Sequence, residues 1–326
     1  MRIASLLPSV TEILFAIGAG ESVVGVTHEC DFPAAARALP ALTSSLLPPE
    51  LQTHLGVAQV GTIVAERAAK IDRHVRANVH SGSSLYALDD ELLERLAPDL
   101  IITQELCEVC AVSYELVARA VKRLRGDPRV ISLEPSSLED VYANIISVGE
   151  LAECARGARE LVAALRARAT ALQARTQSSR ARRTLVLEWT DPPMSGGHWT
   201  PGLVELAGGE PLLANPGANS QTLTWDAITA ADPDVIIVAP CGYDLAHARG
   251  AIDELAVNAT WRALRAVRSG HAYAMDGNAY VNRPGPRLID TAEIFASAIA
   301  GHPAPAEAIE PIIFPAQNRN APSTRR

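Results

Sequence analysis

Short apolar segments with strand character alternate with segments of helical spacing along most of the 326-residue chain. Continuous apolar runs are typical of strands that are buried on both faces, and strands separated by helices pair in parallel. The predicted strands are Arg2–Leu7, Ser22–Thr27, Asp99–Thr103, Arg129–Leu133, Thr184–Trp189, Asp234–Ala239 and Ala272–Asp276. The pattern therefore predicts an α/β fold with mostly parallel sheets.

An internal repeat indicates that this fold has two lobes. Leu96–Ile102 reads as a helix end, a Pro-Asp pair and an apolar strand, and Ala230–Ile237 has the same order. Thr11–Gly18 and Leu203–Gly208 are a second matching pair, in the same order along the chain. The chain length also suits two modest hydrophobic cores better than one. We therefore predict two Rossmann-like lobes.

A helical pattern connects the two lobes. Ser137 suits an N-cap, with Asp140 three residues later, and the pattern continues to about Thr176. An unbroken helix of roughly 40 residues would be about 60 Å long, and Gly149 or Gly157 offers a place where it bends or is interrupted. The expected divisions are an N-terminal α/β lobe (1–136), a linking long helix (137–180), a C-terminal α/β lobe (181–302) and a loose tail (303–326).

Composition excludes some partners and suggests a compartment. The net charge of −8 makes nucleic acid an unlikely ligand, and no window reaches the roughly 18 apolar residues of a membrane span. The segment from Met1 to Pro8 lacks the apolar run of a secretory signal, and five cysteines suit a reducing compartment. We therefore expect a cytoplasmic monomer, or a periplasmic protein if the true start lies upstream of Met1.

The loops that follow the predicted strands contain most of the unusual chemistry. Ligands of open parallel sheets bind outside the carboxyl ends of the strands, where aromatic rings stack on flat ligands and polar groups orient them. The candidate ligand-binding residues are His28, Glu29, Cys30, Asp31, Cys107, Cys110, Glu188, Trp189, His198, Trp199, Cys241, Tyr280 and Arg283. No glycine-rich nucleotide-binding motif is present, and we expect no catalytic residues.

The cysteines leave several interpretations open. Cys107 and Cys110, together with Cys30 and His28, could form a tetrahedral site for zinc or iron. The thiols could instead be packed in the interior or contact the ligand. A cysteine beside a histidine could also act as a nucleophile in an enzyme.

Several short motifs in these loops resemble one family. They are THECD (27–31), CEVCAVS (107–113), LEW-DPP (187–193), GHW (197–199), PCG (240–242) and DGNAY-RPGPR (276–287). Together with the opening segment Arg2–Pro33, they resemble the cobalamin-binding, BtuF-like substrate-binding proteins of ABC transporters, and most closely a signal-less branch with cysteine-rich loops. The resemblance covers about nine-tenths of the chain.

The resemblance implies a class III periplasmic binding protein fold, in which one long helix joins two α/β lobes. It implies a cleft that captures vitamin B12, haem or an iron–siderophore complex and an ABC permease that receives it. Trp189, Trp199 and Tyr280 would stack on the ligand, and Arg283 would contact its polar edges. The expected function is thus binding of a corrinoid or related metal chelate without any required cofactor. The alternatives are a metal-ion delivery protein and a cytosolic thiol-dependent enzyme.

Overall fold

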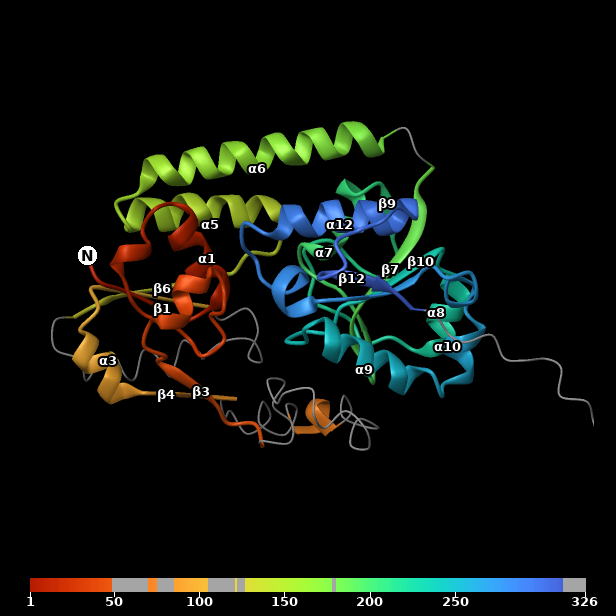
Figure 1. Cartoon of the computed structure of the whole chain (residues 1–326), viewed down its shortest axis with the longest axis horizontal. Coiled ribbons are helices and arrows are strands. Elements are labelled where there is room, and N and C mark those ends of the chain that lie inside the picture. Colours follow the sequence, from red (N-terminus) through yellow and green to blue (C-terminus); the bar gives the residue numbers. More distant parts are fainter. Residues whose placement is uncertain (49–69, 75–84, 105–120, 122–126, 178–179, 313–326) are drawn as a thin grey trace, which may run out of the picture.

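The computed structural model describes residues 1–48, 70–74, 85–104, 121, 127–177 and 180–312, and two sheets form its two lobes (Figure 1). The N-terminal sheet is entirely parallel in the order β2-β1-β5-β6. Its strands are β1 (Ile3–Ser5), β2 (Val23–Gly25), β5 (Leu100–Thr103) and β6 (Arg129–Ser132). Around it lie α1 (Pro8–Ala16), η1 (Gly20–Ser22), η2 (Ala34–Ala38), α3 (Asp90–Leu96) and the antiparallel pair β3 (Thr43–Ser45) and β4 (Tyr86–Leu88).

The C-terminal sheet has the order β12-β11-β10-β7-β8, and β9 also pairs with β7. Its strands are β7 (Arg182–Thr190), β8 (Pro193–Ser195), β9 (Gly209–Pro211), β10 (Val235–Val238), β11 (Ala272–Met275) and β12 (Ile309–Pro311). Its helices are α7 (Thr200–Leu206), α8 (Trp225–Ala231), α9 (Leu245–Leu255), α10 (Ala259–Ala263), α11 (Arg265–Arg268), the π-helical η5 (Gly277–Val281) and α12 (Leu288–Ala300). Only β8 and β12 run antiparallel to their neighbours in the described sheet, which confirms the predicted fold class.

The expectation of a loose tail from residue 303 onward is wrong for β12. This strand pairs with β11, and Ile309, which lies opposite Met275, is buried. Burial of the Ile309 side chain and the backbone hydrogen bonds of the ladder hold the segment in place.

The internal repeat corresponds to a repeated helix–strand connection. Helices α3 and α8 both end in a residue of positive φ (41° and 39°), and each is followed by Pro-Asp and a buried strand. The carboxylate of Asp99 accepts a hydrogen bond from the backbone amide of Arg2 (2.7 Å). In the other lobe, the carboxylate of Asp234 accepts one from the amide of Arg183 (3.0 Å). The same side chain therefore ties the same pair of strands together in both lobes.

The segment expected to be one long helix contains two helices, α5 (Leu138–Leu151) and α6 (Ala155–Thr176). Ser137 caps α5 as predicted, because its side chain accepts the amide of Asp140. The chain then reverses direction at Glu153, which has φ of 58°. A Cβ atom on Gly149 would lie 2.3 Å from the Cβ of Ala158, so the two helices pack too closely for a larger side chain there. The helix is thus interrupted two residues after Gly149, one of the two glycines at which we expected a bend or an interruption.

Helix α6 is the element that spans both lobes (Figure 1). Arg166 on this helix pairs with Glu139 of α5. Two residues later, Arg168 pairs with Asp290 (2.5 Å) and Glu293 (2.9 Å) of α12 in the C-terminal lobe. Neighbouring arginines thus fasten α6 to one helix of each lobe.

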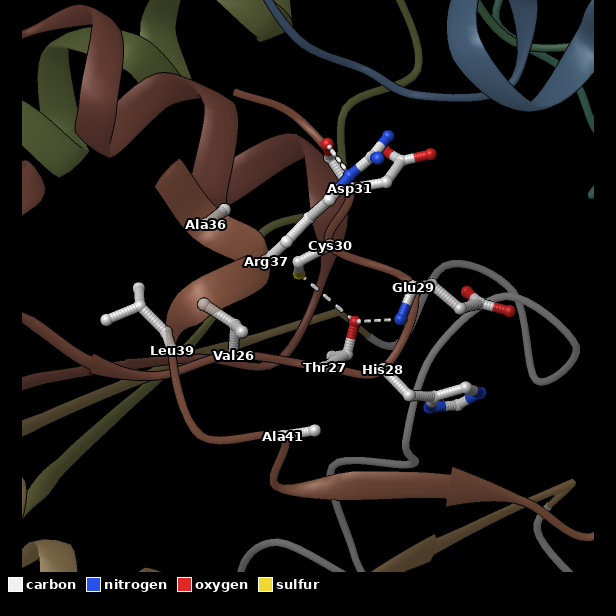
Figure 2. Close-up of a pocket in the computed structure, with 10 residues that line it drawn as sticks. All are labelled: Val26, Thr27, His28, Glu29, Cys30, Asp31, Ala36, Arg37, Leu39 and Ala41. Carbon is white, nitrogen blue, oxygen red and sulfur yellow. Dashed lines mark hydrogen bonds between the residues drawn. The ribbon is translucent and has the colours of Figure 1, made fainter. Parts of the chain in front are cut away.

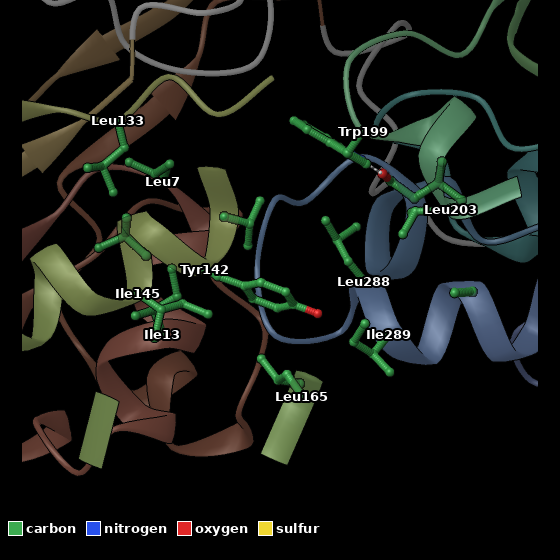
Figure 3. Close-up of a cluster of buried hydrophobic side chains, with 14 of the residues drawn as sticks. Leu7, Ile13, Leu133, Tyr142, Ile145, Leu165, Trp199, Leu203, Leu288 and Ile289 are labelled. Carbon is green, nitrogen blue, oxygen red and sulfur yellow. Dashed lines mark hydrogen bonds between the residues drawn. The ribbon is translucent and has the colours of Figure 1, made fainter. Parts of the chain in front are cut away.

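A continuous hydrophobic core runs beneath α6 from one lobe to the other (Figure 3). It leads from Ile13 of α1 through Tyr142 of α5 and Leu165 of α6 to Leu288 and Ile289 of α12. Two further clusters cover the opposite faces of the two sheets. Within the described residues, no helix is both long and apolar enough to cross a bilayer.

Candidate functional site

The loops at the carboxyl ends of the two sheets meet around Arg283, which is 4% exposed. Its guanidinium donates hydrogen bonds to the carboxylates of Asp31 (2.5 Å) and Glu12 (3.3 Å), both in the N-terminal lobe. It also donates to the carbonyl oxygen of Glu29 (3.2 Å) and the side chain of Asn278 (3.0 Å). Arg283 therefore joins the two lobes through its guanidinium, and its expected contact with the polar edge of a ligand stays a prediction.

Arg287 makes a second connection between the lobes. It donates to both carboxylate oxygens of Glu12, at 2.9 and 2.5 Å. Its guanidinium also lies over the rings of Phe32 (4.4 Å) and Tyr280 (5.5 Å), which are cation–π distances. We call Glu12, Asp31, Arg283 and Arg287 the interlobe charge cluster.

The cluster balances two carboxylates with two guanidinium groups in a largely dry environment. Desolvation alone would raise the pKa of Asp31, but the hydrogen bond and positive charge of Arg283 outweigh it and lower that pKa. Desolvation opposes the charge of Arg283 as well, and Asp31 and Glu12 outweigh it, so the pKa of Arg283 is raised. Both residues stay charged at neutral pH.

The π-helix η5 positions Tyr280 and Asn278 beside this cluster. Asp276 caps it by accepting the amide of Ala279 (2.6 Å), and desolvation raises the pKa of Asp276. Gly277 lies so close to β10 that a Cβ atom there would be 2.3 Å from the carbonyl oxygen of Pro240. A glycine is therefore required where the loops after β10 and β11 cross. Single π-helical turns of this kind often occur at functional sites.

A pocket of about 370 Å³ lies in the N-terminal lobe behind the loop after β2 (Figure 2). Its lining residues are Val26, Thr27, His28, Glu29, Cys30, Asp31, Ala36, Arg37, Leu39 and Ala41. This volume falls within the range of small-molecule sites. The structure thus brings four of the predicted residues, His28 to Asp31, to one hollow.

Cys30 and His28 are held in different directions within this loop. The Cys30 sulfur is buried and lies 3.1 Å from the hydroxyls of both Thr11 and Thr27. Burial raises the pKa of Cys30, so it remains a thiol and a poor nucleophile. The His28 ring projects away from that sulfur in Figure 2, and its Nδ1 lies 2.7 Å from the Thr43 hydroxyl. Glu29, next to them, accepts a hydrogen bond from Tyr86 (3.2 Å).

The predicted metal site is not tested by this arrangement. Cys107 and Cys110 lie outside the described residues. Among the residues that are described, no group of three or more His, Cys, Asp or Glu side chains could hold a metal ion. Zinc or iron binding therefore remains a prediction.

Glu188 and Trp189 end strand β7 in the C-terminal lobe and face different neighbours. Desolvation raises the pKa of Glu188 to about 7, although hydrogen bonds from the Ser220 side chain and the Gly197 backbone act in the opposite direction. The Trp189 ring packs edge-on against Tyr243 at 5.5 Å. Half-buried Cys241 donates its backbone amide to the carbonyl oxygen of Glu188 (3.1 Å).

The ring of Trp189 also belongs to a small apolar cluster with Tyr243, Ala251 and Ile71. Ile71 lies in the chain between β3 and β4 of the N-terminal lobe, whereas the other members belong to the C-terminal lobe. Residues from both lobes therefore cover this ring, which we expected to stack on a ligand.

The expected ring-stacking role of Trp199 is not supported by its position. Trp199 is buried in the core beside Leu203, and its Nε1 donates to the carbonyl oxygen of Val281 (2.8 Å; Figure 3). Its neighbour His198 is half-buried, with Nε2 3.1 Å from Asn219. Desolvation lowers the pKa of His198, so its ring is neutral at pH 7.

Sequence reasoning missed the roles of Glu12, Phe32, Tyr243 and Arg287. Glu12 was hidden in a segment read as an apolar helix face, although a carboxylate in the helix sequence PSVTEILFA is itself a signal of a buried partner. Arg287 closes the motif DGNAY-RPGPR, in which only Arg283 was singled out. Phe32 directly follows the motif THECD, and Tyr243 directly follows the motif PCG.

Comparisons with known proteins agree with this architecture. The model of the periplasmic binding protein family matches residues 3–279. YvrC of Bacillus subtilis (strain 168), an uncharacterized ABC transporter substrate-binding lipoprotein, is 26% identical over 307 residues, covering 91% of this chain and 79% of the relative.

Two solved structures share the fold. The periplasmic vitamin B12 binding protein BtuF of Vibrio cholerae superimposes with a TM-score of 0.62 at 20% identity, over 92% of this chain and 96% of that chain. The periplasmic heme-binding protein RhuT from Roseiflexus sp. RS-1 gives a TM-score of 0.66 at 23% identity, over 92% and 98%. These comparisons confirm the resemblance seen in the motifs. The chain belongs to the periplasmic binding protein family and has its BtuF-like class III fold.

Proposed function

We propose that this protein binds a corrinoid, or a related metal chelate such as haem, between its two lobes and passes it to an ABC permease. The ligand is held without covalent chemistry. One observation supports the proposal: the loops that follow parallel strands of both sheets converge. Tyr280, Trp189 and the segment His28–Asp31, which lines the pocket of the N-terminal lobe, all lie in these loops. Aromatic rings beside polar groups are suited to a large, flat ligand with polar edges.

The relatives support the class of ligand. BtuF and RhuT are named for binding vitamin B12 and heme, two planar metal chelates. The name of YvrC specifies an ABC transporter and a lipoprotein. These names favour the periplasmic alternative over the cytoplasmic one, and they favour a permease partner.

The proposal is tested by titrating the purified protein with cyanocobalamin, hemin, and zinc or ferrous salts in parallel. We expect one chelate to raise the melting temperature with single-site saturation, since a ligand at 100 times its dissociation constant adds about 2.7 kcal/mol. A stoichiometric response to a bare metal ion alone would favour the metal-delivery interpretation. No response to either chelate well above micromolar concentration would count against the proposed function.

A further inference from the structure

The interlobe charge cluster joins two segments that are more than 240 residues apart along the chain, such as Asp31 and Arg283 (separated by 252 positions). The side chains of Glu12 and Arg283 are 2% and 5% exposed, that of Arg287 is 14% exposed and that of Asp31 is 40% exposed. Three of its four members are therefore largely removed from water, and Asp31 lies at the edge. Both carboxylates belong to the N-terminal lobe, and both guanidinium groups belong to the C-terminal lobe.

Glu12 is the member of the cluster that depends most on contact between the two lobes. It is buried on α1 inside its own lobe, yet both of its oxygens accept hydrogen bonds from arginines of the opposite lobe. A buried carboxylate is tolerated only when a partner offsets its desolvation. Movement of the lobes away from each other would leave this carboxylate without the two guanidinium groups that stabilise it.

The cluster also fixes the aromatic rings beside it. The guanidinium of Arg287 lies over the ring of Phe32 in the N-terminal lobe, a residue that is 47% exposed, and over the ring of Tyr280 in the C-terminal lobe. One guanidinium therefore contacts an aromatic ring of each lobe. Both rings lie in the loops at which we propose the ligand binds.

We propose that Arg283 and Arg287 are positioning residues that lock the two lobes in one arrangement and so set the width of the cleft between them. The lock is independent of any ligand, and only its effect on cleft width rests on the proposed function. It acts together with α6, which fastens the lobes through Arg166 and Arg168. The ligand accordingly enters a cleft whose width is already set.

Hydrogen–deuterium exchange of the ligand-free protein tests the lock. Replacing the half-exposed acid (Asp31→Asn) is expected to accelerate exchange about tenfold on both facing surfaces, residues 26–38 and 276–288, because a charge-assisted hydrogen bond across the lobes is lost. Glu12→Gln is expected to act in the same way. Asp31→Glu keeps the charge and is expected to exchange like the parent.

The matched control is Arg265→Gln, which removes a guanidinium paired with Asp232 and Asp234 within the C-terminal lobe. We expect it to leave both facing surfaces unchanged. The lock is overturned if the Asp31→Asn effect stays within residues 1–48, or if it spreads through the sheet of that lobe as general unfolding. Since Asp31→Asn alters an exposed edge, this test stands even if Glu12→Gln does not fold.

A second arm concerns cleft width. In Asp31→Asn, the ratio of cyanocobalamin to hemin affinity is expected to change at least about threefold, on the scale of a modest contact change. An unchanged ratio with altered exchange would overturn the effect on cleft width and leave the lock in place. If neither ligand binds even the parent protein, the proposed function fails, and the exchange result alone still decides whether the lobes are locked.

Discussion

The two lobes are alike where their helices enter the sheets and different where their strands end. Asp99 and Asp234 accept the same kind of hydrogen bond from a backbone amide at the start of a neighbouring strand. At the opposite ends of the strands, the N-terminal lobe offers the carboxylates of Glu12 and Asp31, and the C-terminal lobe offers arginines and the rings of Trp189 and Tyr280. The repeated connection therefore builds the scaffold, and the divergent loops create a complementary pair of faces.

This division predicts that substitutions in the repeated connection affect both lobes alike, whereas substitutions in the divergent loops affect contacts between lobes or with a ligand. The predictions below test that separation in order of decreasing effect.

The largest effect is expected for Glu12→Gln. Breaking a buried ion pair leaves an uncompensated charge, here chiefly on Arg287 because Arg283 keeps Asp31, and costs about 3–5 kcal/mol of unfolding free energy. Urea denaturation of the parent and the variant measures this difference. Arg265→Gln removes an exposed charge pair and is expected to change the midpoint little. Equal losses of unfolding free energy in the two variants would show that the ion pairs between the lobes stabilise the protein no more than an exposed pair does.

A second large effect concerns pH and Glu188. Its pKa is raised from 4.5 to about 7 in the folded protein, chiefly by desolvation. Between these pH values the folded state binds more protons than the unfolded state, so stability falls as the pH rises. We expect Glu188→Gln to remove a fall of roughly 5 °C in melting temperature between pH 5 and pH 8. The idea is contradicted if thermal scans of the parent and of Glu188→Gln give parallel curves across that range.

The repeated connection should respond equally in both lobes. Asp99→Ala and Asp234→Ala each remove the hydrogen bond to a strand amide and are expected to cost about 1–2 kcal/mol. Asp234→Ala also removes the half-exposed ion pair with Arg265, which adds little to that cost. Chemical denaturation gives both values. A large loss of unfolding free energy in one variant with none in the other would mean that the two connections share a geometry but not a role in stability.

The smallest effect is expected in the ring cluster of the C-terminal lobe. Trp189→Ala should weaken binding of the corrinoid or haem about fivefold to tenfold, the value of one aromatic contact. Trp225 of α8, which is also half-buried but packs against Trp261 of α10, provides the matched control Trp225→Ala. Calorimetric titration measures both, and equal affinities in the two variants would remove Trp189 from the ligand site.

The sequence predicts the sheets better than the site because strand signals are local. The apolar runs Asp99–Thr103 and Asp234–Ala239 became β5 and β10 nearly unchanged. The reversal at Glu153 escaped prediction because it depends on the fit of Gly149 against Ala158, which brings together two turns of a pattern that is helical throughout. The spacing of apolar residues along the helical segment does not reveal that contact.

The same limit applies to side chains in the loops. The position of Trp199 after a strand suggested a cleft residue, but its hydrogen bond to Val281 depends on the fold of residues about 80 positions away. Cys30 was correctly placed in a loop near the pocket, yet its burial follows from contact with Thr11 of α1. Sequence position identifies the right loop and does not determine which way a side chain points.

Native mass spectrometry of the protein incubated with equimolar cyanocobalamin and hemin tests the central claim most directly, because one spectrum resolves apoprotein, chelate complexes, metal adducts and oligomers. The account predicts one chelate molecule per chain, on a monomer, with a weaker complex in Trp189→Ala and an undiminished one in Trp225→Ala. A spectrum with only apoprotein, or with a metal ion and no chelate, would contradict it.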